Sequence, residues 1–349
     1  MLNTILGLFS HDIGIDLGTA NTQVLVMGKG IVISEPSVVA MHTKTKTVLA
    51  IGDEAKRMIG RTPSNIKAVR PLRDGVISDF DATEKMLTYF IHKVHEAPSF
   101  IPKIPRPRVV VGIPSNITEV ERRAVHDATR RAGARRVYLI EEPMAAAIGA
   151  GLAVEEASGN MVVDIGGGTT EIAVISLGGI VVNKSIKVAG DKMDEAIITY
   201  IKDTHNLLIG PRTSEDMKIT IGAATIGDNE GHYNVSGRDL STGMPNSLSI
   251  SSDEIAEALR PPLHLMMEAI REAIEDTPPE LIADIYRAGI LLAGGGALLR
   301  GLDTYIAKET GMPVVVADDP ISAVVRGTGK ALEDINLLRK VEILSQELN

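Results

Sequence analysis

Two short stretches of the chain decide its fold: GIDLGTANT, Gly14–Thr22, and VDIGGGTT, Val163–Thr170. In each, an apolar strand ends in an aspartate, Asp16 or Asp164, and a glycine follows two residues later. Hydroxyl or amide side chains come next, and a second apolar run then returns. The pattern predicts a strand–turn–strand hairpin that occurs twice in one chain.

The first hairpin has the composition of a phosphate-binding turn. Gly18 lets the backbone approach an anion closely, and Thr19, Ala20 and Asn21 can present N–H groups to phosphate oxygens. Asp16, at the strand end, is placed to hold Mg²⁺ through water, because Mg²⁺ keeps much of its hydration shell. Taken alone, the same residues also suit a tight turn that satisfies only its own backbone.

The second hairpin favours the phosphate interpretation. Three successive glycines, Gly166, Gly167 and Gly168, are costly in a strand connection unless a ligand lies against the backbone. Thr169 and Thr170 add hydroxyls where a γ-phosphate would lie, and Asp164 repeats the role of Asp16. Two matched copies predict a nucleoside triphosphate and its metal, clamped by both hairpins.

A third glycine-rich loop follows the apolar run 290–293. It reads Gly294-Gly295-Gly296-Ala297, and we expect it to open a helix at Leu298. A strand, a glycine loop and a helix N-terminus can cradle an anion or an adenosine, although a simple strand-to-helix turn has the same composition. The chain contains neither a Walker A loop nor a G-x-G-x-x-G fingerprint.

Carboxylates at two further places are candidates for the site. Glu141 and Glu142 lie between an expected strand and an expected helix, where a carboxylate can orient a water or merely favour the helix dipole. Glu215 and Lys218 are three residues apart on an expected helix and share a face. They could pair with each other at the surface or contact a ribose.

Composition excludes several classes of protein. The 349 residues carry a net charge of −9, which argues against a dedicated nucleic-acid binder. There is no cysteine, so disulfides and thiolate chemistry are excluded. The lack of cysteine is compatible with a reducing cytoplasm. No apolar run approaches the roughly 20 residues that span a bilayer.

The N-terminus is apolar but lacks the basic residues and the cleavage site of a signal peptide. Leu2, Ile5, Leu6 and Phe9 follow a helical spacing and so share one face of a helix. That face could lie in a membrane interface, or it could belong to an ordinary packed or frayed terminus.

Apolar runs and helical patterns alternate along the chain, which predicts an α/β protein. The predicted strands are 13–16, 23–27, 109–113, 137–140, 161–164, 172–176, 290–293 and 314–317. The predicted helices are 118–131 with a capping box, 144–149, 193–205, 253–275 and 321–338. We expect Pro261-Pro262 to kink or split the fourth helix and glycines to interrupt the fifth. The composition of residues 227–246 indicates a polar hairpin, and that of residues 100–108 indicates an extended loop. The spacing of His92 and His95 indicates a solvated helix face.

The hairpins, the Gly294 loop and their order resemble the actin/Hsp70/sugar-kinase ATPase superfamily and, within it, the MreB family of bacterial actins. The matching stretches run from near the start of the chain to about Glu333. They are Ile15–Thr22, Asn65–Phe80, Ile140–Gly151, Met161–Glu171, Gly190–Ile197, His205–Gly210, Gly294–Gly301 and Val316–Pro320.

The resemblance implies an actin-like ATPase fold: two duplicated ribonuclease-H-like lobes around a nucleotide cleft, each with a smaller subdomain. The first lobe would take residues 1–150, with a subdomain at about 33–70, and would be completed by 318–349. The second would take 151–317, with a subdomain at about 182–252. Homopolymerisation into paired filaments at the inner face of the cytoplasmic membrane is also implied, as is partnership with membrane-bound cell-wall synthesis and cell-shape proteins.

The resemblance also assigns roles to residues. Phosphates would be held by Thr19, Ala20, Asn21, Gly167, Gly168 and Thr169, and adenosine by Glu215, Asp216, Met217, Lys218, Gly295, Gly296, Ala297 and Leu298. Asp16 and Asp164 would organise Mg²⁺, while Glu142 and Thr169 would position the attacking water. The apolar N-terminal face and a loop at Phe100-Ile101 would contact the membrane.

We therefore expect a slow ATPase whose hydrolysis times filament disassembly and whose filaments maintain rod cell shape. One alternative is a small-molecule kinase of the same superfamily, which would need an Asp base that we do not identify. An Hsp70-like chaperone would need a further peptide-binding domain, for which the chain has no room. A filament that binds ATP without hydrolysing it is opposed by the presence of Glu142 and Thr169.

Overall fold

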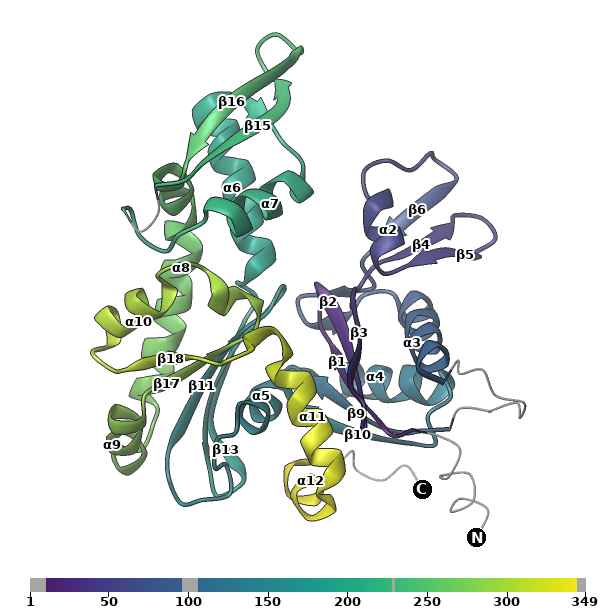
Figure 1. The fold of residues 1–349 in the computed structure, drawn as a ribbon, viewed down its shortest axis with the longest axis vertical. Coiled ribbons are helices and arrows are strands. Elements are labelled where there is room, and N and C mark those ends of the chain that lie inside the picture. The colour runs from purple at the N-terminus through teal and green to yellow at the C-terminus, as the bar shows by residue number, and fades with distance from the viewer. Residues whose placement is uncertain (1–10, 96–105, 228–229, 344–349) are drawn as a thin grey trace. The chain divides into compact units, whose positions relative to one another are not determined.

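The computed structural model describes residues 11–95, 106–227 and 230–343 (Figure 1). The chain divides into two compact units. Unit 1 takes residues up to Ala157, Ile175–Ile180 and the residues from Ile321 onward; unit 2 takes Ser158–Val174 and Val181–Pro320. The predicted N-terminal membrane face and the Phe100-Ile101 loop lie outside the described residues.

Unit 1 is built on a five-stranded sheet of order β10-β9-β1-β2-β3. Its strands β1 and β2 are antiparallel, whereas β1, β9 and β10 are parallel to one another. The strands form because short apolar, β-branched runs are buried in the sheet. They are β1 (Ile13–Leu17), β2 (Asn21–Val26), β3 (Gly30–Pro36), β9 (Arg108–Ile113) and β10 (Arg136–Glu141).

Unit 2 repeats this topology. Its five-stranded sheet has the order β13-β12-β11-β17-β18, so β11 and β12 stand where β1 and β2 stand in unit 1. The parallel neighbours β17 and β18 take the places of β9 and β10. The strands are β11 (Asn160–Ile165), β12 (Thr170–Ser176), β13 (Gly179–Ile186), β17 (Ile290–Ala293) and β18 (Val314–Val316). The duplication that the two hairpins predict is therefore present in the whole sheet.

Helices accompany each sheet, and short β-sheets extend each unit (Figure 1). Unit 1 has α2 (Asp53–Met58), α3 (Phe80–His95), α4 (Glu119–Arg131), α5 (Glu142–Ala150), α11 (Ala323–Glu333) and α12 (Ile335–Val341). Unit 2 has α6 (Gly190–His205), α7 (Pro211–Ile221), α8 (Ser252–Glu275), α9 (Pro279–Ala288) and α10 (Leu302–Thr310).

The smaller sheets carry the remaining strands. In unit 1 these are β4 (Val39–His42), β5 (Val48–Ile51) and β6 (Ile66–Val69), with the pair β7 (Leu72–Arg73) and β8 (Val76–Ile77). In unit 2 they are β14 (Leu207–Leu208), β15 (His232–Asp239) and β16 (Pro245–Ser251). The last two form the polar hairpin predicted from residues 227–246. The predicted lobe and subdomain boundaries stay a prediction.

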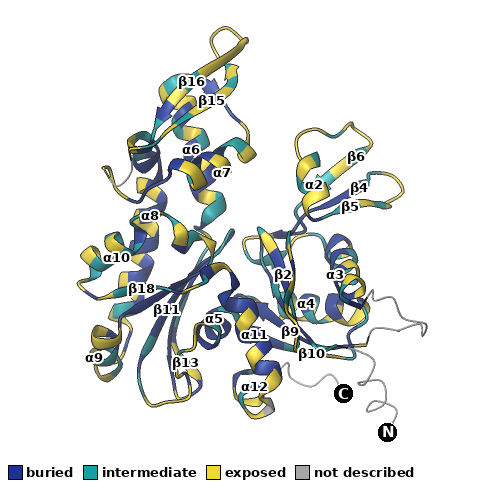
Figure 2. Ribbon diagram, viewed as in Figure 1, coloured by how far each residue is buried: buried dark blue, intermediate teal, exposed yellow. Residues whose placement is uncertain are grey.

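Each unit has its own hydrophobic core, and the central strands are among the most buried elements (Figure 2). In unit 1 the core lies between the sheet and helices such as α3, whose Met86, Leu87 and Phe90 are fully buried. In unit 2 the sheet packs with α6 and α8, which contribute Ile197, Ile201 and Leu259 among others. Burial of apolar surface on this scale is the main favourable term in folding each unit.

The predicted strands are all present, and the capping box of α4 is confirmed, with Glu121 N–H donating to Thr118 Oγ1 at 3.2 Å. The helix at 253–275, predicted to be kinked or split at Pro261-Pro262, is not split, and a kink there stays a prediction. Helix α8 runs without a break from Ser252 to Glu275 with Pro261 and Pro262 inside it. Its long apolar face is buried in the core of unit 2, and that packing outweighs the loss of two backbone donors.

Two other expectations need correction. Glycines do not interrupt the last helical segment: Gly327 and Gly329 lie inside α11, and the break falls at Asp334, whose carboxylate caps α12. His95 is not on a solvated helix face, since only 8 % of its surface is exposed. Its Nδ1 lies 2.6 Å from the Ile91 carbonyl oxygen, and its Nε2 accepts from the His11 N–H at 3.2 Å.

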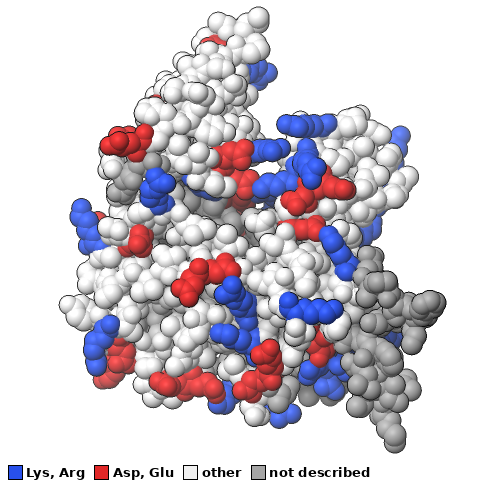
Figure 3. Space-filling view, viewed as in Figure 1, with Lys and Arg blue, Asp and Glu red and all other residues white. Residues whose placement is uncertain are grey.

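Among the described residues, no helix combines the length and the apolarity that crossing a bilayer requires. On the face drawn in Figure 3, basic and acidic side chains are interspersed, and neither sign forms a continuous sheet of charge.

Candidate functional site

The first hairpin lies in unit 1 at the turn between β1 and β2, where Asp16 pairs in register with Gln23. Ser37 fastens this turn from outside, because its hydroxyl donates to the Gly18 carbonyl at 2.6 Å and its N–H donates to the Ala20 carbonyl at 3.0 Å. In a trans peptide the next N–H points opposite to the carbonyl, so those of Thr19 and Asn21 point away from Ser37.

A second contact holds the turn from another loop. The Gly75 N–H donates to Thr19 Oγ1 at 3.0 Å, in a segment where both Asp74 and Gly75 have positive φ. The Thr19 side chain is buried, so its hydroxyl serves this contact while its backbone lines the turn. Gly18 must remain glycine, because a Cβ would lie 2.6 Å from the Asn21 carbonyl oxygen.

The second hairpin lies in unit 2, where Gly166 N–H donates to the Thr169 carbonyl at 2.9 Å and closes the turn between β11 and β12. The N-terminus of α6 fastens this turn. Gly190 N–H donates to the Gly166 carbonyl at 3.1 Å, and Asp191 N–H donates to the Gly167 carbonyl at 2.7 Å. The N–H groups of Gly167 and Gly168 consequently point away from α6.

The two turns are therefore held in the same way. Donors from a neighbouring segment bind carbonyl oxygens of the turn, and the N–H groups of the turn consequently point to the opposite side. Ser37 does this for the first turn and the α6 N-terminus does it for the second. A row of backbone N–H groups turned to one side is a binding surface for an anion. Sequence reasoning missed Ser37 and Gly75, since neither lies in a hairpin; Gly75 lies in a stretch quoted for the resemblance.

The aspartates of the hairpins have limited contact with solvent: Asp164 is buried and Asp16 is partly buried. Asp164 is 5 % exposed, and burial raises the pKa of Asp16 to about 7. A buried carboxyl of this kind ionises more readily when a cation lies beside it, and carboxylate oxygens suit Mg²⁺. The described residues contain no cluster of three or more metal-binding side chains. One carboxylate per hairpin, with water and phosphate as other ligands, fits Mg²⁺, which is seldom held by protein groups alone.

The Gly294 loop lies directly against the second hairpin. In the sheet, Asp164 of β11 is in register with Ala293 of β17. Gly294 has φ +77°, and a Cβ there would lie 2.4 Å from both Asp164 Oδ1 and the Ile165 carbonyl oxygen. The expected helix beginning at Leu298 is wrong: Gly295–Leu298 form a 3-10 turn, and α10 begins at Leu302. The side chain of Leu298 is exposed, whereas that of Ala297 is buried.

Helix α7 supplies the predicted adenosine residues. Met217 is fully buried in the core of unit 2, so its side chain is a packing group. Lys218 contacts α6: its Nζ lies 2.8 Å from Asp194 Oδ1 and donates to the Gly190 carbonyl at 2.9 Å. Asp216 is exposed and Glu215 partly exposed. Asp194 is a further residue that sequence reasoning missed.

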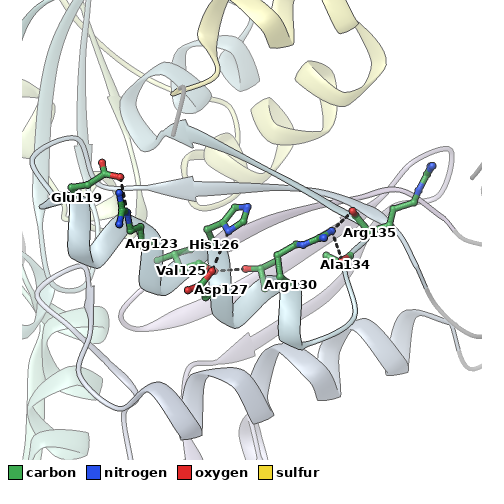
Figure 4. Close-up of polar contacts among 9 residues, drawn as sticks. Glu119, Arg123, Val125, His126, Asp127, Arg130, Ala134 and Arg135 are labelled. Carbon is green, nitrogen blue, oxygen red and sulfur yellow. Dashed lines mark hydrogen bonds and ion pairs between the residues drawn. The ribbon is translucent and has the colours of Figure 1, made fainter. Parts of the chain in front are cut away.

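Glu142 lies in unit 1 as the first residue of α5, followed by Pro143 in the first turn. It is close to the first hairpin, because Gly112 is in register with Asp16 and its Cβ position is 3.6 Å from Glu142 Cγ. Strand β10, which delivers Glu142, follows a turn held by Arg130, whose guanidinium donates to the Ala134 carbonyl at 3.2 Å and also to that of Arg135 (Figure 4).

The structure therefore assembles the predicted residues in two groups. Unit 1 holds Asp16, Gly18, Thr19, Ala20, Asn21 and Glu142. Unit 2 holds Asp164, Gly166, Gly167, Gly168, Thr169, α7 and the Gly294 loop. Each group contains one turn with directed N–H groups and one aspartate in the strand that leads into that turn.

Comparison with known proteins identifies the family. The family model MreB/Mbl protein matches residues 10–340. The chain is 54 % identical to the cell shape-determining protein MreB of Escherichia coli K12 over 341 residues, covering 97 % of each chain. It is 51 % identical to the cell shape-determining protein Mbl of Bacillus subtilis 168, covering 95 % of this chain and 99 % of that one.

Solved structures agree with this assignment. MreB5 of Spiroplasma citri bound to AMPPNP superposes with a TM-score of 0.87 at 38 % identity, covering 94 % of this chain and 97 % of that one. A MamK double helical filament subunit superposes with a TM-score of 0.78 at 21 % identity, covering 93 % and 99 %, which shows the shared fold. The chain has an actin-like fold and belongs to the MreB/Mbl family.

Proposed function

We propose that this protein is an ATP-dependent cytoskeletal filament protein that binds Mg-ATP through both hairpins and hydrolyses it slowly. Its filaments organise cell-wall synthesis and maintain rod cell shape. Two relatives at 51 % and 54 % identity are named cell shape-determining proteins, and the MreB5 structures at 38 % identity hold AMPPNP and ADP. These findings support the proposal.

One observation carries the nucleotide part of the proposal. In both hairpins the carbonyl oxygens of the turn are bound from outside, and the turn's N–H groups are directed the other way. A tight turn that only reverses the chain direction does not require hydrogen bonds from another segment, yet both hairpin turns have them. Preorganised N–H groups stabilise charge on phosphoryl oxygens without reorganisation during the reaction.

Hydrolysis would follow from the charged and hydroxyl groups beside the turns. Asp16 and Asp164 would hold Mg²⁺ through water, and that ion supplies charge neutralisation for the phosphates. Glu142, at the N-terminus of α5, would orient a water for in-line attack on the γ-phosphate, assisted by the Thr169 hydroxyl. The residues of α7 and of the Gly294 loop would hold the adenosine.

Assembly and location are part of the same proposal. The protein would form a homopolymer of paired protofilaments at the inner face of the cytoplasmic membrane, with membrane-bound cell-wall synthesis and cell-shape proteins as partners. Leu2, Ile5, Leu6 and Phe9, with Phe100 and Ile101, would provide the membrane contact. Their apolar character and the helical spacing of the first four support this role.

Phosphate release from Mg-ATP tests the catalytic assignment. We expect Glu142→Gln to bind ATP with nearly unchanged affinity and to lose at least about 10²-fold in hydrolysis rate, as for other general bases. Glu141→Gln, the adjacent residue, is the matched control and should keep the wild-type rate. Equal rates in all three proteins would refute the role of Glu142. Consumption of ATP only when a sugar-like acceptor is supplied would refute the filament ATPase in favour of a kinase.

A further inference from the structure

A buried ion pair joins α6 to α7 within unit 2. Lys218 Nζ lies 2.8 Å from Asp194 Oδ1, and the two side chains are 16 % and 12 % exposed. Ser214 strengthens the same junction, because its hydroxyl is fully buried and donates to the Asp194 carbonyl at 2.7 Å. Removing one partner of such a pair would leave an uncompensated charge in a poorly solvated position and would destabilise the folded protein.

The same lysine also contacts the chain that fastens the second hairpin. Lys218 Nζ donates to the Gly190 carbonyl at 2.9 Å, while the Gly190 N–H donates to the Gly166 carbonyl at 3.1 Å. Gly190 is closely surrounded, since a Cβ there would lie 3.4 Å from both Gly166 O and Lys218 Nζ. A continuous path therefore runs from Asp194 through Lys218 and Gly190 to the turn.

The surroundings of Asp194 shift the pKa of its carboxyl group in opposite directions. Burial raises the pKa of Asp194 to about 6, Lys218 lowers it, and the nearby Glu215 and Asp191 raise it. Lys218 is thus the cation that keeps Asp194 ionised in a site that otherwise disfavours the charge. Loss of the carboxylate charge would release Lys218 from its position beside Gly190.

We propose that Asp194 is a positioning residue for phosphate binding: through Lys218 and Gly190 it fixes the Gly166–Gly168 turn in the conformation that directs N–H groups to a phosphate. Asp194 itself does not contact the ligand. This inference rests on the proposed nucleotide-binding function, and it gives Lys218 a structural task in addition to its predicted contact with adenosine. Contacts at α7 and contacts at the phosphates are coupled by this path.

Comparing a phosphorylated ligand with an unphosphorylated one separates an effect of Asp194 on phosphate binding from an effect on adenosine binding. Affinities of the full-length protein for Mg-ADP and for adenosine are measured by calorimetry in the wild type and in Asp194→Asn, which keeps the shape and removes the charge. We expect Mg-ADP to bind at least about tenfold more weakly and adenosine to stay within about twofold. Arg260→Met, which removes an exposed pair with Glu257 elsewhere in unit 2, is the control and should change neither affinity.

Lys218→Met is the second variant and reports on the same path if Asp194→Asn does not fold. It should lose more affinity for Mg-ADP than for adenosine. The inference is overturned if both variants keep wild-type affinity for Mg-ADP, or if both ligands weaken equally, because the pair would then serve the adenosine site or general stability. Failure of the wild type itself to bind Mg-ADP would instead refute the proposed function, and the coupling with it.

Discussion

At the scale of single residues, Gly294 shows how closely the loop after β17 packs on the second hairpin. A Cβ at this position would lie 2.4 Å from Asp164 Oδ1, and φ is +77°. We expect Gly294→Ala to lower the free energy of unfolding by about 2–3 kcal/mol, from backbone strain and overlap together. Gly295→Ala is the matched control, since its Cβ meets nothing within 4 Å, and should stay within about 0.5 kcal/mol. Urea unfolding measures both; equal stabilities would contradict the geometry.

Asp194 gives a pH dependence whose sign follows from its pKa. The folded-state pKa is about 6, above the ordinary value of 3.8, so between these values the folded protein binds more protons than the unfolded chain. Stability contributed by this group is therefore fully present below pH 3.8 and is lost as the pH rises through 6. The effect is of the order of 1–3 kcal/mol.

The measurement is urea unfolding of wild type and Asp194→Asn at pH 5 and pH 7.5. The stability of the wild type relative to the variant should fall between the two pH values, because the variant lacks the titrating group. A difference that stays constant, or that grows with pH, would show that burial does not dominate at Asp194.

Individual residues of the candidate site were predictable where their types repeat along the chain. Asp16 and Asp164, with the glycines after them, stand out because the pattern occurs twice. Ser37, Gly75 and Asp194 could not be identified in this way. Each acts through a contact with a residue distant in sequence, and a lone serine, glycine or aspartate carries no local signal of such a contact.

At the scale of elements, α5 and α11 approach each other at the level of the backbone. A Cβ on Gly149 would lie 1.8 Å from the Ala323 carbonyl oxygen, and a Cβ on Gly327 would lie 1.8 Å from that of Ala145. We expect Gly149→Ala and Gly327→Ala each to destabilise unit 1 by about 1–3 kcal/mol, because the helices must separate. The exposed Glu333→Ala on α11 is the control in thermal unfolding; glycine variants as stable as this control would mean that the helices are less tightly packed.

Helix α8 carries its two prolines at a cost. Pro261 is exposed, so its ring adds little packing while it deprives the helix of a backbone donor. We expect Pro261→Ala to raise the free energy of unfolding by about 1–3 kcal/mol, with the smaller gain in Pro262→Ala because Pro262 is buried. Chemical denaturation compares the two variants, and destabilisation by Pro261→Ala would show that the ring has a contact of its own.

The failures of sequence reasoning at this scale have one physical origin. Prolines and glycines predicted a kink or split at Pro261-Pro262 and interruptions of the last helix. Both helices nevertheless continue through these residues, because their buried faces are packed. Gly327 lies where α11 meets α5, and Gly329 lies against the Leu25 side chain of β2, so both glycines mark close approach and not a break. Tertiary packing overrides propensity at these positions.

At the scale of the whole molecule, the two five-stranded sheets have the same strand order, and each places its hairpin at the same position. Duplication was visible in the sequence because glycine and aspartate recur at the hairpins. The equivalence of β9 and β10 with β17 and β18 was not visible in the sequence, since these apolar strands share no repeated residue pattern. The assignment to the MreB/Mbl family makes filament formation the central claim about function.

The apolar N-terminal face gives a separate expectation for this scale. Deletion of residues 1–10 should strongly reduce binding to liposomes, with Phe100 and Ile101 as the remaining contact. It should leave phosphate release from Mg-ATP unchanged, because the candidate site lies in other residues. Replacement of Leu2, Ile5, Leu6 and Phe9 by serine is the matched variant of unchanged length. Flotation with liposomes measures the binding, and full binding by both variants would contradict a membrane role for this face.

Sedimentation of the purified 349-residue protein, with and without Mg-ATP, shows whether Mg-ATP drives the protein to form filaments. We expect the protein to pellet only with Mg-ATP, filaments to be present in the pellet, and pelleting to rise with protein concentration above a threshold. A protein that stays in the supernatant at every concentration with Mg-ATP, while it binds and hydrolyses the nucleotide, would contradict the claim that its ATPase serves a filament.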